Sequence, residues 1–327
     1  MAEQSPSHPL LPKPVSPQRL EPLPWQAPKP PEEDPDAPRR VQQILASPSY
    51  RPAVQDVQFL NRYETRPARL QLDYMKPELG LQENGVRNTI VVFGSTRIPE
   101  PAAAKRKLAV LKEALAKRPD SGELQQRVKV AEKIAAKSRY YDIAREFGRL
   151  VGHAGHGPLD CRLVVMTGGG PGMMEAANRG AFDVGAKTVG LNITLPHEQF
   201  PNPYITPELC FQFHYFALRK MHFLLRAKAL VVFPGGYGTF DELFETLTLV
   251  QTRKIRPLPV VLVGKEYWQR AVNFDFLVEE GTIDPEDKEL FWYAETAQEI
   301  WDGIVWWYES NGESLINGEP FPGVAVE

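Results

Sequence analysis

The sequence predicts an α/β fold, with a mainly parallel sheet covered by helices on both faces. Two observations support this prediction. Apolar runs of strand length, such as Thr89–Phe93 and Ala229–Val232, alternate along the chain with segments of helical periodicity. Two of the runs lead directly into a glycine-rich turn and then into a helix. Such alternation favours parallel strands that are buried on both faces.

The segment that precedes the first strand divides into two parts. Residues 1–40 hold 12 of the 31 prolines, and such a composition supports neither a helix nor a sheet core, so we predict a disordered proline-rich arm. Residues 41–85 show short helical patterns with a modest apolar face, and we expect them to form a helical N-terminal extension.

Residues 86–310 are expected to form one α/β domain, followed by a C-terminal tail over 311–327. A helical hairpin over 100–140 is expected as an insertion after the first strand, because its leucines recur at helical spacing. This stretch is rich in Lys and Arg, but it lacks interleaved aromatic residues, so we expect a solvated surface and no nucleic-acid partner. The expected strands are 89–94, 162–167, 187–192, 211–216, 229–233, 259–264 and 290–294, and the expected later helices are 173–186, 217–228, 239–252, 266–280 and 296–310.

The most informative segment is the glycine-rich turn from Phe233 to Gly238. Its three glycines let the backbone approach a ligand, and the helix that follows offers free N–H groups, so the turn predicts a phosphate site. Asp241 and Glu242 lie in the first helical turn, where carboxylates would repel phosphate unless they take part in chemistry. Thr239 and Glu242 also have the spacing of a capping box, which is the structural alternative.

A second glycine-rich turn, Gly168–Gly172, follows the strand that ends at Thr167. A dinucleotide site would require an acidic residue about 20 positions further on, to bind the ribose hydroxyl. The next strand ends instead in Asn192-Ile193-Thr194, and the chain has no P-loop ending in Gly-Lys-Ser/Thr. These features favour a mononucleotide ligand.

Arg219 and Lys220 form a third feature, near the start of the helix after the aromatic run Phe211–Phe216. Cations there oppose the helix dipole at a cost of roughly 0.3–1 kcal/mol each. A nearby anion would remove that cost. The alternative is an ordinary surface pair.

Together these segments resemble the LOG (lonely guy) family, formerly described as lysine decarboxylases. The resemblance covers residues 88–310 and implies a Rossmann-like fold. It also implies a phosphoribohydrolase, which cleaves the N-glycosidic bond of a purine or cytokinin nucleoside 5′-monophosphate, such as AMP, to free base and ribose 5-phosphate. The matching residues are Gly94-Ser95, Gly168-Gly169-Gly170, Arg219-Lys220-Met221 and the Pro-Gly-Gly-x-Gly-Thr-x-x-Glu pattern from Pro234 to Glu242.

Arg219 and Glu242 match the family's catalytic pair. Breaking the C1′–N bond develops oxocarbenium character, so a fixed carboxylate at Glu242 would stabilise the charge and orient water. Arg219 would hold the phosphate or neighbouring oxygens, and Asp241 is a lesser alternative carboxylate. The phosphate is expected on the backbone N–H groups of Gly169, Gly170, Gly235, Gly236 and Gly238 and on the Thr239 hydroxyl, with Gly94, Ser95, Gly168, Gly172, Met173, Lys220 and Tyr237 as further substrate-binding candidates.

The alternative function is a carrier or regulatory protein that binds a nucleotide or a phosphorylated cofactor without turning it over. Glu242 discriminates between the two, because a pure binder gains little from a carboxylate beside phosphate. Lysine decarboxylation would need pyridoxal phosphate on a lysine Schiff base. Lys220 is the nearby lysine, and that reaction would leave Arg219 and Glu242 without roles.

Further expectations concern cofactors, partners and location. The two cysteines and six histidines show no metal-ligand spacing, so we expect no metal and no cofactor, with a nucleotide as the small-molecule partner. The N-terminus lacks a secretory signal and no apolar run reaches membrane-spanning length, so we expect a cytoplasmic protein. The tryptophans near the C-terminus would suit an interface, and members of the family are usually dimeric or larger. We therefore expect a homodimer or a higher homo-oligomer.

Overall fold

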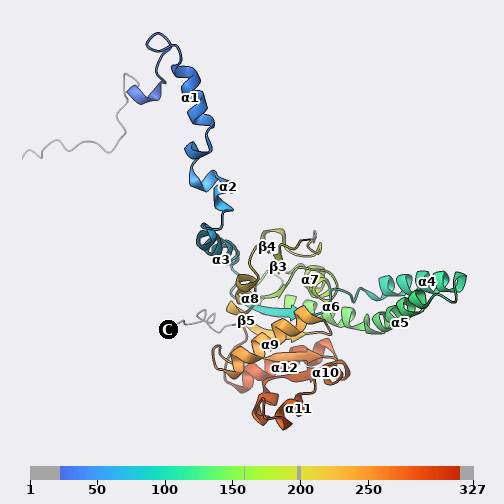
Figure 1. The fold of residues 1–327 in the computed structure, drawn as a ribbon. Coiled ribbons are helices and arrows are strands. Elements are labelled where there is room, and N and C mark those ends of the chain that lie inside the picture. Colours follow the sequence, from blue (N-terminus) through green and yellow to red (C-terminus); the bar gives the residue numbers. More distant parts are fainter. Residues whose placement is uncertain (1–22, 158, 197–199, 317–327) are drawn as a thin grey trace, which may run out of the picture. The chain divides into compact units, whose positions relative to one another are not determined.

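The computed structural model describes residues 23–157, 159–196 and 200–316, and the chain divides into two compact units at Pro67 (Figure 1). The first unit contains α1 (Ala37–Ala46), α2 (Val57–Leu60) and short 3-10 segments. α1 begins inside the segment for which the sequence predicts an arm, because Pro38 lies in the first helical turn, where no backbone N–H is needed. Residues 1–22 of that arm and 317–327 of the tail lie outside the described residues.

The second unit is built on a seven-stranded sheet in which every neighbouring pair of strands is parallel. This arrangement confirms the predicted α/β fold. The strand order is β4-β3-β2-β1-β5-β6-β7. The strands are β1 (Asn88–Phe93), β2 (Leu163–Thr167), β3 (Thr188–Ile193), β4 (Cys210–Phe213), β5 (Ala227–Val232), β6 (Val260–Val263) and β7 (Trp292–Ala294).

Helices cover both faces of this sheet, as predicted (Figure 1). Alternate residues of each strand enter opposite apolar clusters: Ile90 and Val92 of β1 join one cluster, and Val91 and Phe93 join the other. The first cluster includes residues of α6 (Arg139–Gly152), α7 (Met173–Asp183) and α12 (Ala297–Ser310). The second includes residues of α3 (Arg66–Glu83), α8 (Phe216–Leu225), α9 (Tyr237–Gln251) and α10 (Lys265–Ala271).

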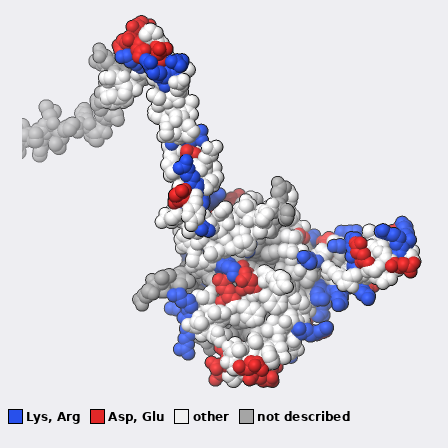
Figure 2. Space-filling view, viewed as in Figure 1, with Lys and Arg blue, Asp and Glu red and all other residues white. Residues whose placement is uncertain are grey.

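The insertion after β1 is a hairpin of α4 (Pro101–Lys117) and α5 (Gly122–Lys137). A small apolar cluster of its own, which includes Leu111 and Val128, joins the two helices. Figure 2 shows Lys, Arg, Asp and Glu side chains intermingled over this hairpin rather than one continuous basic face. The Lys112 Nζ, for example, lies 2.8 Å from the Glu132 Oε1 on the other helix of the hairpin. The mixed charge agrees with a solvated hairpin.

Several expected element boundaries are wrong. The helix expected over 173–186 ends at Asp183, the helix expected from residue 239 begins at Tyr237, and the strand expected over 211–216 ends at Phe213. The single helix expected over 266–280 is divided into α10 and α11 (Phe274–Glu279), because the Asn273 side chain accepts from the Phe276 N–H and starts a new helix. The helix expected to reach residue 228 ends at Leu225, because β5 already begins at Ala227. Along the described residues, no helix combines the length and the apolar character that crossing a bilayer demands.

The chain order reverses between β1 and β5, which lie side by side at the centre of the sheet. In open parallel sheets, ligands bind at the carboxyl ends of the strands that flank such a reversal. Here Gly94 follows β1 and the turn that starts at Phe233 follows β5. The Ser95 N–H donates to the Pro234 carbonyl oxygen at 3.0 Å, so the two turns are joined directly. The topology therefore places a ligand site at these turns.

Candidate active site

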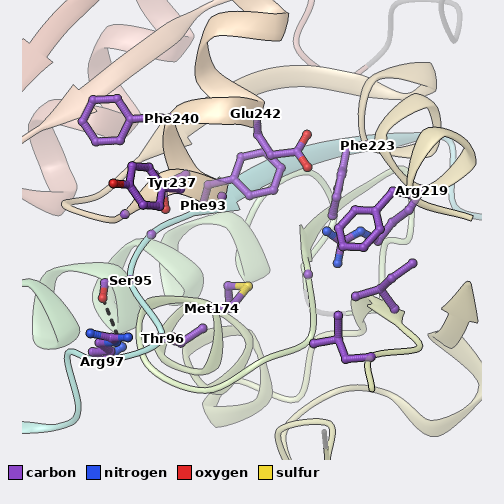
Figure 3. Close-up of a pocket in the computed structure, with 18 of the residues that line it drawn as sticks. Phe93, Ser95, Thr96, Arg97, Met174, Arg219, Phe223, Tyr237, Phe240 and Glu242 are labelled. Atoms are coloured by element: carbon purple, nitrogen blue, oxygen red, sulfur yellow. Dashed lines mark hydrogen bonds between the residues drawn. The ribbon is translucent and has the colours of Figure 1, made fainter. Parts of the chain in front are cut away.

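A cavity of about 900 Å³ opens at this point of the sheet. Its volume is within the range of roughly 300–1,000 Å³ that is usual for small-molecule sites. Figure 3 shows side chains that line it. Most of the lining residues come from the end of β1 and the turn after it, from the turn after β5 and from helices α8 and α9, and the others from the turn after β2, from β3 and the segment after it, from α7 and from α10. Of the residues that the sequence predicts for the site, the cavity brings together Gly94, Ser95, Gly168, Arg219, Gly236, Tyr237, Gly238, Thr239 and Glu242.

The turn after β2 serves mainly as support. The Gly169 N–H donates to the Thr167 hydroxyl at 2.9 Å, so it is engaged within the protein rather than open to phosphate. Asn202 donates its backbone N–H to the Gly169 carbonyl oxygen and its amide nitrogen to that of Gly170. Neither glycine lines the cavity. These contacts shape the wall and leave its surface to other residues.

Gly172 and Met173 also support the cavity without lining it. The Met173 N–H donates to the Ser95 carbonyl oxygen at 3.1 Å, which ties α7 to the turn after β1. A Cβ on Gly94 would lie 2.6 Å from the Met173 Cβ, and one on Gly172 would lie 2.3 Å from the Ser95 oxygen. Glycine at both positions is therefore required for the close approach of the two segments.

The N-terminus of α9 forms the part of the wall that suits an anion. α9 begins at Tyr237 with Gly236 as its N-cap and no side-chain cap, so the capping box considered from the sequence does not form. Its absence follows from the earlier helix start, which places Thr239 inside the helix. Among the described residues, none accepts a hydrogen bond from the N–H groups of Tyr237 and Gly238. Those donors and the positive end of the helix dipole are available to phosphate.

Gly235 does not line the cavity but makes this turn possible. A Cβ at this position would lie 2.0 Å from the Thr239 Oγ1. The Tyr267 hydroxyl donates to the Gly235 carbonyl oxygen and fixes the turn from the side of α10. Gly235 therefore shapes the turn through packing, and the contact with phosphate that the sequence suggested for it stays a prediction.

Glu242 lies on α9, its residue surface is only 7% exposed, and its side chain lines the cavity. No hydrogen bond or ion pair joins its carboxyl group to another described residue. Burial raises the pKa of this carboxyl to about 7, although the nearby cations of Lys220 and Arg219 act to lower it. An unpaired buried carboxylate of this kind is a recognised sign of a functional site.

Arg219 faces the same cavity from α8 (Figure 3). Its guanidinium lies over two rings, 4.9 Å from the centroid of Phe216 and 5.6 Å from that of Phe223. Its Nε is buried and has no hydrogen-bond partner among the described residues. Burial lowers the pKa of this guanidinium, against the raising influence of Glu242 and Asp241. The donor is therefore free to bind an oxygen of a ligand.

Lys220 and Asp241 are engaged with each other instead of with the cavity. The Lys220 Nζ lies 2.9 Å from Asp241 Oδ1 and 2.9 Å from Glu245 Oε2, which joins α8 to α9. Neither Lys220 nor Asp241 lines the cavity. Glu242 is thus the carboxylate that the described part of the chain presents there, and Asp241 is not.

Several lining residues were not identified from the sequence. Arg97 lies in the turn after β1, with its N–H donating to the Ser95 hydroxyl at 3.1 Å, and it forms no ion pair with another described residue. Its position three residues after Gly94 was the signal that could have found it. The apolar lining comes from scattered elements and has no common sequence signal. It includes Phe93, Met174, Ile193, Leu195, Phe216, Phe223, Phe240 and Ala271.

Comparisons with known proteins point to one group. A family model described as possible lysine decarboxylase matches residues 174–304. The probable cytokinin riboside 5′-monophosphate phosphoribohydrolase LOGL3 of Oryza sativa subsp. japonica is 30% identical over 153 residues, which are 43% of this chain and 67% of that protein. The cytokinin riboside 5′-monophosphate phosphoribohydrolase LOG3 of Arabidopsis thaliana is 31% identical over 170 residues, which are 50% of this chain and 74% of that protein.

Solved structures resemble the chain more distantly. The molybdenum cofactor binding protein of the phototrophic bacterium Rippkaea orientalis matches with a TM-score of 0.36 and 16% identity, over 50% of this chain and 85% of that one.

Proposed function

Because the chain belongs to the LOG family, to which relatives named cytokinin riboside 5′-monophosphate phosphoribohydrolases also belong, we propose that it hydrolyses a purine nucleoside 5′-monophosphate. The substrate would be AMP or an N6-substituted, cytokinin-type relative. The bond cleaved is the N-glycosidic bond, and the products are the free base and ribose 5-phosphate.

One observation carries this proposal: the buried carboxyl group of Glu242 and the partly buried guanidinium of Arg219 line one cavity, and neither has a hydrogen-bonded partner in the described protein. Burying a charge without a partner costs free energy. A site that only bound phosphate would gain nothing from Glu242, which repels it. The carboxylate is useful where positive charge develops, as it does at C1′ when a glycosidic bond breaks.

The lining residues suggest how the substrate lies. Arg97 and Ser95 are at the end of the cavity opposite Arg219 in Figure 3, beside the start of α9. The free N–H groups of α9 and the unpaired guanidinium of Arg97 would hold the phosphate there. The apolar wall formed with Phe223 would take the base. This orientation keeps the phosphate away from Glu242 and brings the sugar beneath it.

The reaction then follows from this placement. The bond from C1′ to the base nitrogen breaks, with its electron pair going to the base. The Glu242 carboxylate stabilises the cationic sugar, orients a water molecule and takes its proton, while the water oxygen bonds to C1′. Arg219 holds sugar oxygens through its free Nε–H. The base takes up a proton from solvent on leaving, and Glu242 later releases to solvent the proton it took from the water, so that no net proton is consumed.

The family model's description as a possible lysine decarboxylase finds no support in the position of Lys220. Its amino group is held by Asp241 and Glu245 and lies outside the cavity lining. A Schiff-base lysine has to reach the cofactor's aldehyde inside the site.

Incubating the full-length protein with AMP and measuring adenine release tests the proposal. We expect Glu242→Gln and Arg219→Ala to lower kcat by about 10²- to 10³-fold, the usual effect of removing a group that stabilises the transition state. Glu242→Gln should still bind AMP, because it removes a charge that repels the phosphate. Glu245→Gln is the matched control, since it removes a carboxylate from the same helix outside the cavity.

The alternative, a nucleotide or phosphorylated-cofactor carrier, has a different outcome. If the wild-type protein and all three variants bind AMP and none releases adenine, the carrier function replaces the hydrolase.

A further inference from the structure

Asp73 on α3 contacts the segment that leads into α8. Its carboxylate accepts hydrogen bonds from the backbone N–H of His214 at 3.1 Å and of Tyr215 at 2.9 Å. Tyr215 is the N-cap of α8, and its own side chain caps nothing. Asp73 therefore fixes, from another helix, the backbone that leads into α8, and it also places a negative charge near the positive end of the helix dipole.

The helical turn held in this way is the one that carries Arg219. The Arg219 N–H donates to the Tyr215 carbonyl oxygen at 3.3 Å, so the positions of these two residues are linked directly. Phe216, which stacks on the guanidinium, lies in the same turn. The Arg69 Nε–H donates to the Tyr215 hydroxyl at 3.2 Å, which adds a second contact from α3. Any shift of Tyr215 would move Arg219.

α3 also contacts α8 further along, away from the cavity. The His222 Nε2 lies 3.1 Å from the Tyr74 carbonyl oxygen, and Arg226 binds both carboxylate oxygens of Glu78. These contacts stabilise the packing of the two helices. Asp73 differs from them because it acts at the end that bears the candidate catalytic arginine.

We propose that Asp73 is a positioning residue for Arg219. This proposal rests on the proposed function. α3 lies outside residues 174–304, which the family model matches, so the segment before the first strand would contribute to the reaction by holding α8 in register. Geometry matters at this level, because misplacing a catalytic group by about 1 Å can cost on the order of 10²-fold in rate.

A double-mutant cycle in the full-length protein tests it. Four proteins are compared for adenine release from AMP: wild type, Asp73→Ala, Arg219→Ala and the double variant. We expect Asp73→Ala to lower kcat by about tenfold or more, with KM changed far less, and to have no further effect once Arg219 is absent. Asp73→Asn keeps an oxygen acceptor without the charge, so its kcat should lie between those of the wild type and of Asp73→Ala. Equal losses from Asp73→Ala in both backgrounds would overturn the proposal.

Glu78→Gln is the matched control for a purely structural role, since it weakens the same helix pair at the other end of α8. It should lower the thermal midpoint and leave kcat near the wild-type value. A kcat loss equal to that of Asp73→Ala would show that loosened packing alone explains the effect.

The proposed function can fail separately. If AMP binds without release of adenine, the same four proteins are compared by their Kd for AMP, and the double-mutant cycle is calculated from these values. If AMP does not bind, hydrogen exchange decides: Asp73→Ala should speed exchange of the amides of residues 214–219 and leave those of 222–226 unchanged. A uniform increase along α8, or none, would overturn the positioning role.

Discussion

Glu242 is the residue whose environment is most unusual. Its carboxyl group is buried without a partner, and its pKa rises from 4.5 to about 7. The two cations nearest to it do not neutralise it: Arg219 makes no ion pair with it, and Lys220 is bound to Asp241 and Glu245. The group is therefore partly ionised at neutral pH, where small changes of pH alter its charge.

This titration predicts the pH dependence of catalysis. Only the ionised carboxylate can stabilise a cationic sugar, so kcat/KM for AMP should rise with pH and level off above about 7. Measuring kcat/KM between pH 5 and 9 checks this. Glu242→Asp, which keeps a carboxyl group, should retain a pH-dependent rise, whereas a flat wild-type profile across the range would contradict the assignment.

The stability of the fold should depend on pH in the opposite sense. Because the folded-state pKa lies above the unfolded value, the folded state binds the proton more tightly, and its advantage is complete below about pH 4.5 and lost as the pH rises through 7. Glu242→Gln removes this dependence. The variant should therefore gain stability relative to the wild type between pH 5 and 8 in chemical denaturation, and a constant difference would exclude a perturbed Glu242.

At the scale of elements, α8 and α9 each carry one candidate catalytic residue and are joined by the ion pairs of Lys220. Lys220 thus joins the two helices, whereas the sequence suggested that it contacts the ligand. The α4–α5 hairpin, by contrast, has its own apolar cluster and contributes no residue to the cavity.

Shortening this hairpin tests its independence. We expect removal of residues 108–135, with a Gly-Ser linker in their place, to leave kcat/KM for AMP within about twofold, because sites that share no partners behave independently. Circular dichroism and the thermal midpoint verify the fold. Loss of activity in a folded variant would instead assign the hairpin a part in substrate binding or assembly.

At the scale of the whole molecule, the cavity lies where the strand order reverses, and every residue that lines it belongs to the unit after Pro67. A chain beginning at Arg66 retains α3 with Asp73. We expect this chain to fold and bind AMP with the wild-type Kd, and its thermal midpoint to change by less than about 3 °C, which corresponds to roughly 1 kcal/mol at this size. Titration calorimetry measures the Kd and scanning calorimetry the thermal midpoint. A shortened chain that does not fold would contradict the division into two units. The expected homo-oligomer stays a prediction.

The sequence was sufficient for the alternation of strands and helices, because apolar periodicity and glycine turns are local properties of the chain. It also named Arg219 and Glu242 as candidates, since their spacing from the glycine turns matches a family pattern, and the structure brings both to one cavity. The parallel sheet with helices on both faces followed from the same evidence. The errors at residues 225 and 273 arose where a neighbouring strand or a capping side chain decided where a helix ends.

Only the tertiary structure decided which of the candidate side chains line the cavity. The capture of Lys220 by Asp241 and Glu245, and the internal bonding of the Gly169 amide, depend on partners that packing brings together. Arg97 and the apolar wall were also recognised only in the structure, because packing brings their scattered segments together. Local pattern determines which residues can carry chemistry, whereas burial, charge pairing and hydrogen bonding between distant segments determine which of them are free to do so.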